Sequence, residues 1–190
     1  MKQVLLCCAL ASLLSASAVG AQVELAYDDG SFERAVGWDE AGNGVAVRFT
    51  APGCVLTGAK FWCLGGQMQN DLGICVLDSN GPGGAPGDTL CTYFQWPFGA
   101  YPQVVTFPVE IVPPHPDFYI VYVQTGWGGA DANTYGLDTS SPWAGRSWSF
   151  VNHAWSPMGP AYGNVMIHAL VQQATPTEAA TWGRLKGTYR

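Results

Sequence analysis

Residues 118–123 read FYIVYV, six apolar residues in unbroken succession, and this stretch decides the fold. A strand with one face in water alternates apolar and polar residues, whereas a strand that is covered on both faces is apolar throughout. The stretch therefore predicts a central strand that is buried on both sides of a sheet.

The segments on either side carry the alternating form of the same signal. Val23, Leu25 and Tyr27 alternate with Glu24 and Ala26, and residues 45–49 repeat the pattern. Turn residues separate further expected strands at 55–64, 72–77, 89–95, 103–109, 147–151 and 164–171. Because proline cannot donate to a ladder, Pro108 restricts its strand to a sheet edge or a strand end.

About nine strands without long helical periodicity predict an all-β fold, in which two antiparallel sheets pack as a jelly-roll-like β-sandwich. An open barrel is the alternative. The first and last strands of such sandwiches often lie side by side, so residues 23–27 are expected to pair with residues 164–171.

The two ends of the chain differ from this body. Residues 1–21 combine Lys2, an apolar run over 4–14 and a small-residue end at Ala21, which predict a cleaved signal peptide. A bilayer needs about 20 apolar residues, so we expect no transmembrane span and a secreted, periplasmic or bacterial cell-surface location. Residues 22–172 are the expected sandwich domain, and residues 173–190 form a basic tail. A short helix, a sorting segment and a disordered end are the alternatives for the tail.

The predicted domain is acidic. Residues 22–172 hold thirteen carboxylates against four Lys and Arg residues, a net charge of −9. Such a surface repels phosphate backbones, so no nucleic acid partner is expected, whereas cations such as calcium are attracted.

Four cysteines follow the signal peptide: Cys54, Cys63, Cys75 and Cys91. An even number in an oxidising compartment favours two disulfides. Cys75 and Cys91 flank a Gly- and Pro-rich loop, so they are candidates for a cross-hairpin bridge that leaves Cys54 with Cys63. A Cys63–Cys75 bridge and four free buried thiols are the alternatives.

The chemistry-bearing residues are few. The sequence contains no HExxH, Gly-x-Ser-x-Gly or Walker-type motif. His168, within the last expected strand, is interpreted as a structural histidine. Carboxylates at Glu33, Asp39 and Glu40 could form a hydrolytic pair, but a solvated turn explains them equally well. We therefore expect no enzymatic activity, with a hydrolase as the remote alternative.

A calcium site is the metal prediction. Asp28, Asp29 and Glu33 concentrate three carboxylates in one turn, and hard oxygen ligands are those that calcium prefers. An Asp-Gly turn is the alternative. Asp131, Asn133 and Asp138 form a second oxygen-rich loop. A structural calcium ion is the cofactor that these patterns favour.

Aromatic residues are densest between Trp127 and Tyr162. Trp143, Trp148 and Trp155 flank loops and could stack on the apolar faces of sugars, with Arg146 binding the same ligand. The alternative is that rings such as Trp148 fill the core and Arg146 pairs with Asp138.

Three stretches carry a family resemblance: YDDG at 27–30, DSNGPGGAPGD at 78–88 and GLDTSSPWAGRSW at 136–148. Together they resemble an uncharacterised family of bacterial extracellular β-sandwich domains. The resemblance implies an accessory module that accompanies secreted peptidases or surface proteins, and it brings no catalytic residues with it. The ending WGRLKGTYR is similar to the tails of exported bacterial proteins.

The resulting expectation is a non-catalytic secreted or cell-surface sandwich module that serves adhesion, envelope structure or scaffolding. A carbohydrate-binding module is the alternative function. The expected partner is a polysaccharide or another cell-envelope component.

Overall fold

The computed structural model describes residues 21–64, 72–95, 102–125 and 134–173, and in this part of the chain every regular element longer than three residues is a β-strand. The predicted all-β class is confirmed, and the sheets are antiparallel. Residues 1–20 of the predicted signal peptide and residues 174–190 of the predicted tail lie outside the described residues.

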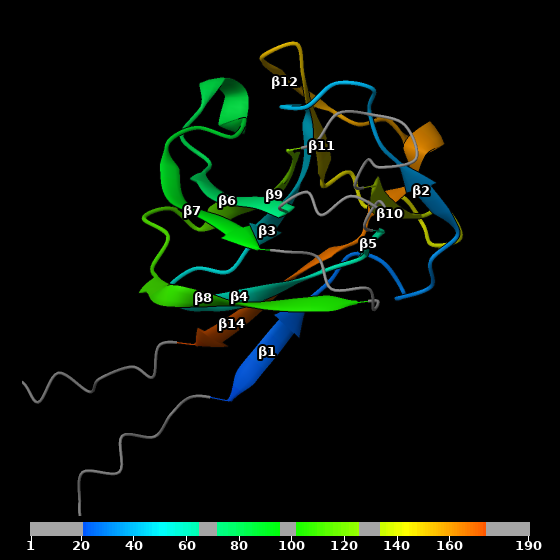
Figure 1. Ribbon diagram of the computed structural model, residues 1–190. Coiled ribbons are helices and arrows are strands. Elements are labelled where there is room, and N and C mark those ends of the chain that lie inside the picture. Colours follow the sequence, from blue (N-terminus) through cyan, green and yellow to red (C-terminus); the bar gives the residue numbers. More distant parts are fainter. Residues whose placement is uncertain (1–20, 65–71, 96–101, 126–133, 174–190) are drawn as a thin grey trace, which may run out of the picture.

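A four-stranded sheet forms the lower layer in Figure 1. Its strands, in spatial order, are β1 (Gln22–Leu25), β14 (Ile167–Gln173), β4 (Cys54–Phe61) and β8 (Gln103–Ile111). The predicted pairing of the first and last strands is confirmed, because Leu25 lies opposite Ala169 and Gln22 opposite Gln172. β8 is an edge strand, as Pro108 requires.

A six-stranded sheet forms the opposite layer. Its strands, in spatial order, are β12 (Ala154–Pro157), β11 (Ser147–Val151), β3 (Gly44–Thr50), β9 (Asp117–Gln124), β6 (Leu72–Asp78) and β7 (Thr89–Gln95). β9 contains the FYIVYV stretch and lies between β3 and β6, so the predicted central strand is confirmed.

The burial of β9 explains its unbroken apolar run. Phe118, Ile120 and Tyr122 point into the main core between the two layers. Tyr119 and Val121 point the other way, into a smaller cluster on the outer face of the six-stranded sheet that Trp148 and Trp155 partly cover. Apolar residues are therefore needed on both faces of this strand.

A small third sheet closes one end of the sandwich, on the right in Figure 1. It consists of β13 (Asn164–Val165), β10 (Thr134–Asp138) and β2 (Arg34–Val36), with β5 (Cys63–Leu64) also paired to β10. Two short 3₁₀ helices, η1 (Pro82–Gly84) and η2 (Pro160–Tyr162), lie in connections between strands. β2, β10 and β12 are strands that the sequence patterns did not predict.

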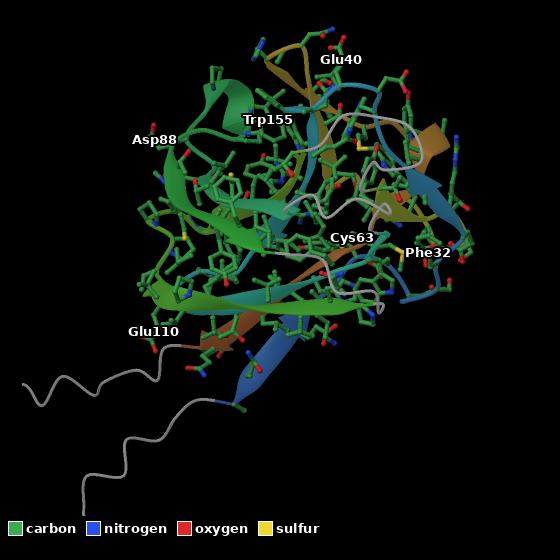
Figure 2. All side chains as sticks on the ribbon, in the orientation of Figure 1. Phe32, Glu40, Cys63, Asp88, Glu110 and Trp155 are labelled. Atoms are coloured by element: carbon green, nitrogen blue, oxygen red, sulfur yellow. The ribbon has the colours of Figure 1, made fainter. Side chains whose placement is uncertain are left out.

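The predicted disulfides are not found, since all four cysteines are free. Cys91 packs against the main core and Cys75 against the outer cluster, so the two thiols lie on opposite faces of their hairpin. Cys63 is in the main core (Figure 2), which separates it from Cys75 in the same way.

The remaining pair is separated by distance. β4 begins at Cys54 and ends before Cys63, and eight strand residues span about 26 Å, far beyond the Cα separation of a disulfide. Burial raises the pKa of the Cys63 thiol to about 12. The Cys63 thiol is therefore protonated and behaves as a small hydrophobic group.

Candidate functional site

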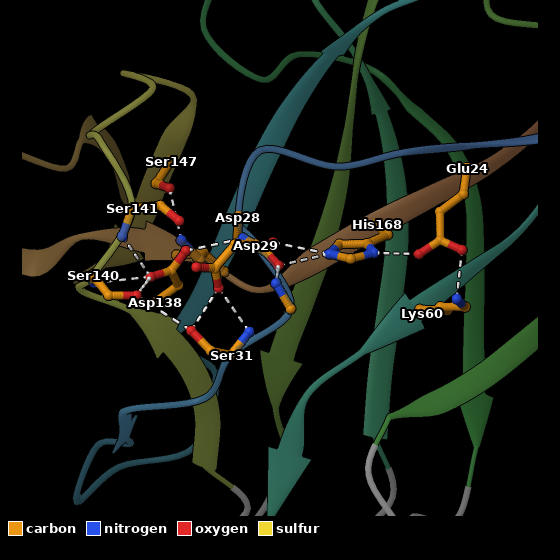
Figure 3. Close-up of polar contacts among 12 residues, drawn as sticks. Glu24, Asp28, Asp29, Ser31, Lys60, Asp138, Ser140, Ser141, Ser147 and His168 are labelled. Carbon is orange, nitrogen blue, oxygen red and sulfur yellow. Dashed lines mark hydrogen bonds and ion pairs between the residues drawn. The ribbon is translucent and has the colours of Figure 1, made fainter.

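The connection between β1 and β2 carries carboxylates to two different partners (Figure 3). Asp28 and Glu24 lie on either side of His168, which projects from β14. The His168 Nε2 atom is 2.8 Å from Asp28 Oδ1, and Nδ1 is 2.5 Å from Glu24 Oε1. Lys60 of β4 forms an ion pair with the other Glu24 oxygen. We name these four residues the histidine clamp.

The histidine clamp is buried at its centre. The side chain of His168 is 6% exposed and that of Asp28 is not exposed at all. The Trp62 ring lies against the imidazole, with 4.4 Å between ring centroids. Burial alone would lower the pKa of His168, but its hydrogen bonds to the carboxylates of Asp28 and Glu24 more than offset this effect and raise the pKa. Both ring nitrogens therefore donate to carboxylates in the charged form.

Beside the histidine clamp, three other carboxylates converge. One oxygen from each of Asp29, Glu33 and Asp138 lies within 4.8 Å of the others. Asp29 and Asp138 are 109 residues apart in the sequence and are joined by the Asp29 N–H, which donates to Asp138 at 3.1 Å. We name these three residues the acidic cluster.

Hydrogen-bond donors hold the like charges together. Asp138 accepts from the backbone N–H groups of Ser140 and Ser141, each at 2.9 Å. Ser31 contacts both Asp29 and Glu33 through its hydroxyl, at 2.5 Å in each case. A carboxylate that accepts several N–H bonds keeps its charge at lower pH.

The pKa directions agree with this arrangement. Burial opposes ionisation of Asp138, yet the hydrogen bonds from Ser141, Asp29 and Ser140 hold its pKa well below its usual range. Hydrogen bonds from the side chain and backbone of Ser31 lower the pKa of Asp29. The acidic cluster therefore presents charged oxygen atoms, the donor set that hard divalent cations bind.

Two glycines let the backbone approach closely at this end. A Cβ atom on Gly136 of β10 would lie 2.9 Å from both Phe32 and Trp62. Gly163 has a φ of +78°, and a Cβ there would lie 2.3 Å from the Asp138 carbonyl oxygen. Side chains at either position would push apart the segments that hold the acidic cluster and the histidine clamp.

The predicted metal ligands are divided by the fold. Asp29 and Glu33 meet in the acidic cluster, whereas Asp28 turns away to His168. The third carboxylate is Asp138, which the sequence placed in a separate oxygen-rich loop. Asp131 and Asn133 of that loop lie outside the described residues.

The predicted aromatic ligand site is also divided. Trp143 is 45% exposed in a loop. Trp148 packs edge-on against Tyr119 with 5.8 Å between centroids, and Trp155 packs on Phe150 at 4.9 Å. Trp148 and Trp155 therefore cover the outer cluster, and Trp127 lies outside the described residues.

Arg146 is not paired with Asp138. Its guanidinium lies 5.2 Å from the centre of the Tyr27 ring and donates to Thr50 Oγ1 at 3.0 Å. Asp138 is hydrogen-bonded by Ser140, Ser141 and Asp29 instead, so the alternative of an Arg146–Asp138 pair is wrong.

Sequence reasoning missed two further arrangements. A groove of about 320 Å³ opens beside Trp38, Tyr135 and Tyr162, residues that come from three separate segments.

The second arrangement joins a histidine to a carboxylate. His115, which is 53% exposed, places Nδ1 2.8 Å from the Asp78 carboxylate, which is 2% exposed. A buried carboxylate that orients an exposed histidine is one half of a nucleophile-activating triad. Only spatial proximity reveals either arrangement.

Comparison with known proteins places these features in context. No protein-family model matches the chain. It is 35% identical over 166 residues to Bacillopeptidase F of Bacillus subtilis (strain 168), an alignment that covers 80% of this chain and 11% of that protein. The chain thus spans about one ninth of the curated relative that it matches.

Two solved structures share the fold. A clostridial cysteine protease, Cwp84 after propeptide cleavage, matches with a TM-score of 0.61 and 12% identity, over 80% of this chain and 40% of that chain. The cysteine protease and lectin-like domains of Cwp84, described as a surface layer associated protein of Clostridium difficile, match with a TM-score of 0.53 and 13% identity, over 70% of this chain and 33% of that chain.

These comparisons correct one prediction. Each named match is a peptidase, which overturns the expectation that the chain is not an enzyme. The prediction failed because a motif search compares only short patterns, whereas the similarity to Bacillopeptidase F extends over 166 residues. Among the described residues, no helix is long and apolar enough to cross a membrane. The chain is an all-β sandwich with sequence similarity to part of a peptidase and fold similarity to part of a surface-associated one.

Proposed function

We propose that this chain is a secreted, surface-associated accessory domain of the kind found in peptidases, with adhesion or scaffolding as its role. The observation that carries the proposal is the alignment of 80% of the chain with only 11% of Bacillopeptidase F. A segment of that size is one domain of a longer protein. The sandwich fold shared with the surface layer associated protein Cwp84 supports the surface location.

A domain exchange tests the proposal. Residues 22–172 would replace the aligned segment of Bacillopeptidase F in its native host, beside a deletion of that segment and the unmodified protein. If the domain is accessory, the exchange restores the secreted amount and cell-wall fraction of the peptidase that the deletion loses. An exchange that behaves like the deletion contradicts the proposal.

A hydrolase is the second candidate, because His115 is oriented by the buried Asp78 and its side chain is 53% exposed. The test is turnover of peptide and ester substrates by the full chain. His115→Ala should abolish turnover if the pair is catalytic. His153→Asn, at an exposed hairpin position where Asn tolerates the φ of 61°, is the matched control and should retain it.

Carbohydrate binding through Trp143, Arg146, Trp148 and Trp155 has one supporting observation, the exposure of Trp143. Half-burial of Trp148 and Trp155 on the outer cluster opposes it. Binding to a glycan array that Trp143→Ala abolishes would support this alternative. An array without hits would remove it.

Calcium binding at the acidic cluster remains a proposal that the spacing of Asp29, Glu33 and Asp138 supports. An ion at 100 times its dissociation constant stabilises by about 2.7 kcal/mol, which raises the melting temperature. Glu33→Gln should abolish the rise, whereas Asp39→Asn, an exposed acid outside the cluster, should preserve it. Identical melting in calcium and in chelator would contradict the proposal.

A further inference from the structure

Two arginines face each other across neighbouring strands of the six-stranded sheet. β11 and β3 pair with Ser147 opposite Val47. One residue further on, the same register places Arg146 opposite Arg48, whose backbone N–H donates to the Arg146 carbonyl oxygen at 2.9 Å. Like charges directly opposite each other in a sheet are destabilising. We name Arg48 and Arg146 the arginine pair.

Among the described residues, the arginine pair has no carboxylate partner. Residues 22–172 hold thirteen carboxylates and only four Lys and Arg residues, two of which form this pair. The ion pairs in the described part of the chain involve Lys60, His115 and His168 instead. The positive charge of two adjacent arginines is therefore left for an anion from outside the domain.

The surroundings of the two guanidinium groups satisfy them only in part. Arg48 is half-buried, and its Nε atom is buried without a hydrogen-bond partner in the described part of the chain. Arg146 is also half-buried and donates to Thr50. Burial raises the pKa of Tyr119, and both arginines oppose that rise, so both lie near its hydroxyl. Asp117 acts on the same hydroxyl, but its carboxylate accepts from Thr50 Oγ1 at 2.5 Å. A guanidinium carries five N–H donors, so the pair retains donors for a ligand.

An exposed tryptophan lies beside the arginine pair. Trp143 is 45% exposed, and a Cβ atom added to Gly145, directly before Arg146, would lie 3.7 Å from the Trp143 ring. An exposed indole offers a flat apolar surface on which the CH groups of a sugar can stack. Guanidinium groups bind carboxylates through their planar set of N–H donors. A sugar that carries a carboxylate therefore matches both features.

We propose that the arginine pair binds the carboxylate of a uronic acid residue in a cell-envelope saccharide, with Trp143 stacking on the sugar ring. The net charge of −9 over residues 22–172 repels polymers with a charge on every unit, so a saccharide with isolated uronic acid residues is the better ligand. The inference rests on the proposed surface role and gives its carbohydrate alternative a specific ligand. It requires neither Trp148 nor Trp155.

The test is calorimetric titration of the full chain with a trisaccharide that carries one glucuronic acid residue, beside its methyl ester, which lacks the charge. Saturable binding of the acid alone is expected. Arg48→Gln and Arg146→Gln should each weaken it by about tenfold, the effect of one lost charge-assisted hydrogen bond. Trp143→Ala should weaken it by about fivefold, the effect of a lost ring contact. Arg34→Gln, at an exposed position of β2 outside the pair, is the matched control and should leave binding unchanged.

Three results would overturn the proposal. One is the absence of binding of the acidic trisaccharide to the folded chain. The second is equal binding of the acid and its methyl ester, a comparison that needs no variant and shows directly whether the carboxylate is recognised. The third is equally tight binding of an acetylated peptide with a free C-terminal carboxylate, which would assign the arginine pair to peptides. The assay contains no peptidase, whereas the domain exchange measures secretion and cell-wall location of one, so the two proposals fail separately.

Discussion

The acidic end of the sandwich and the groove beside Trp38, Tyr135 and Tyr162 differ in charge. In the histidine clamp and acidic cluster, His168 and Asp138 are hydrogen-bonded by partners from β1 and the adjoining loops. None of the residues that line the groove is charged. A buried charged network contributes to stability only while its partners are kept together, whereas an exposed side chain such as Tyr162 contributes little.

The largest expected effect is at the clamp. His168→Ala leaves the unexposed Asp28 carboxylate without its cation, and breaking a buried pair in this way costs about 3 kcal/mol or more of unfolding free energy. Urea denaturation at pH 6 measures it. Lys60→Ala, whose side chain is 26% exposed, should cost less than about 1 kcal/mol. Equal losses for both variants would mean that the clamp is no more than a surface ion pair.

The next effect is at the acidic cluster. Asp138→Asn removes the charge that accepts the N–H groups of Ser140 and Ser141, and hydrogen bonds to charged groups contribute about 2 kcal/mol. Denaturant unfolding without added metal should show a loss of that order. Asp39→Asn, on an exposed loop, should change stability by less than about 0.5 kcal/mol. If Asp138→Asn left the stability unchanged, the repulsion among the three carboxylates would be as large as the contribution of these hydrogen bonds.

The pH dependence of stability distinguishes the histidine clamp from the acidic cluster, because their contributions change with pH in opposite directions. His168 has a raised pKa, so its contribution is complete below the usual value of 6.5 and is lost as pH rises through the folded-state pKa. Asp29 and Asp138 have lowered pKa values, so their contribution is present above 3.8 and is lost as pH falls. The melting temperature should therefore decline as the pH rises above 6.5 and as it falls below 3.8. His168→Gln should remove the decline above pH 6.5 and keep the acidic one.

The smallest effect is expected in the groove. Tyr162 is 52% exposed and packs little, so Tyr162→Ala should change unfolding free energy by less than about 1 kcal/mol. Chemical denaturation checks this prediction. A loss as large as that of His168→Ala would place Tyr162 in the structural framework, and the contrast between the two regions would disappear.

Sequence patterns predicted strands well where the apolar spacing was regular. β3, β6, β7, β9 and β11 lie where alternation or apolar runs placed them. β2, with three residues, is too short to show a period. β10 reads TYGLD and was interpreted as part of an oxygen-rich loop, although its backbone pairs with β2, β5 and β13. Pairing in space overrides such weak local signals.

Cysteine counting failed for a related reason. Even numbers and flanking positions bring Cys75 and Cys91 together in sequence, but the pleat sends their side chains to opposite faces of the sheet. The face to which a side chain points depends on the register of its strand, and a shift of one residue moves it to the other face.

The sequence by itself determined the all-β class and the buried central strand, because local periodicity reports which faces of a strand are covered. The pairing of the first and last strands followed from the usual topology of β-sandwiches. It also identified His168 as structural and found two members of the acidic cluster. Only the tertiary structure joined Asp29 to Asp138 across 109 residues and Asp28 to His168 across 140 residues. It alone brought Trp38, Tyr135 and Tyr162 together from three separate segments. Contacts between distant segments depend on how sheets pack, and no pattern along the chain encodes that packing directly.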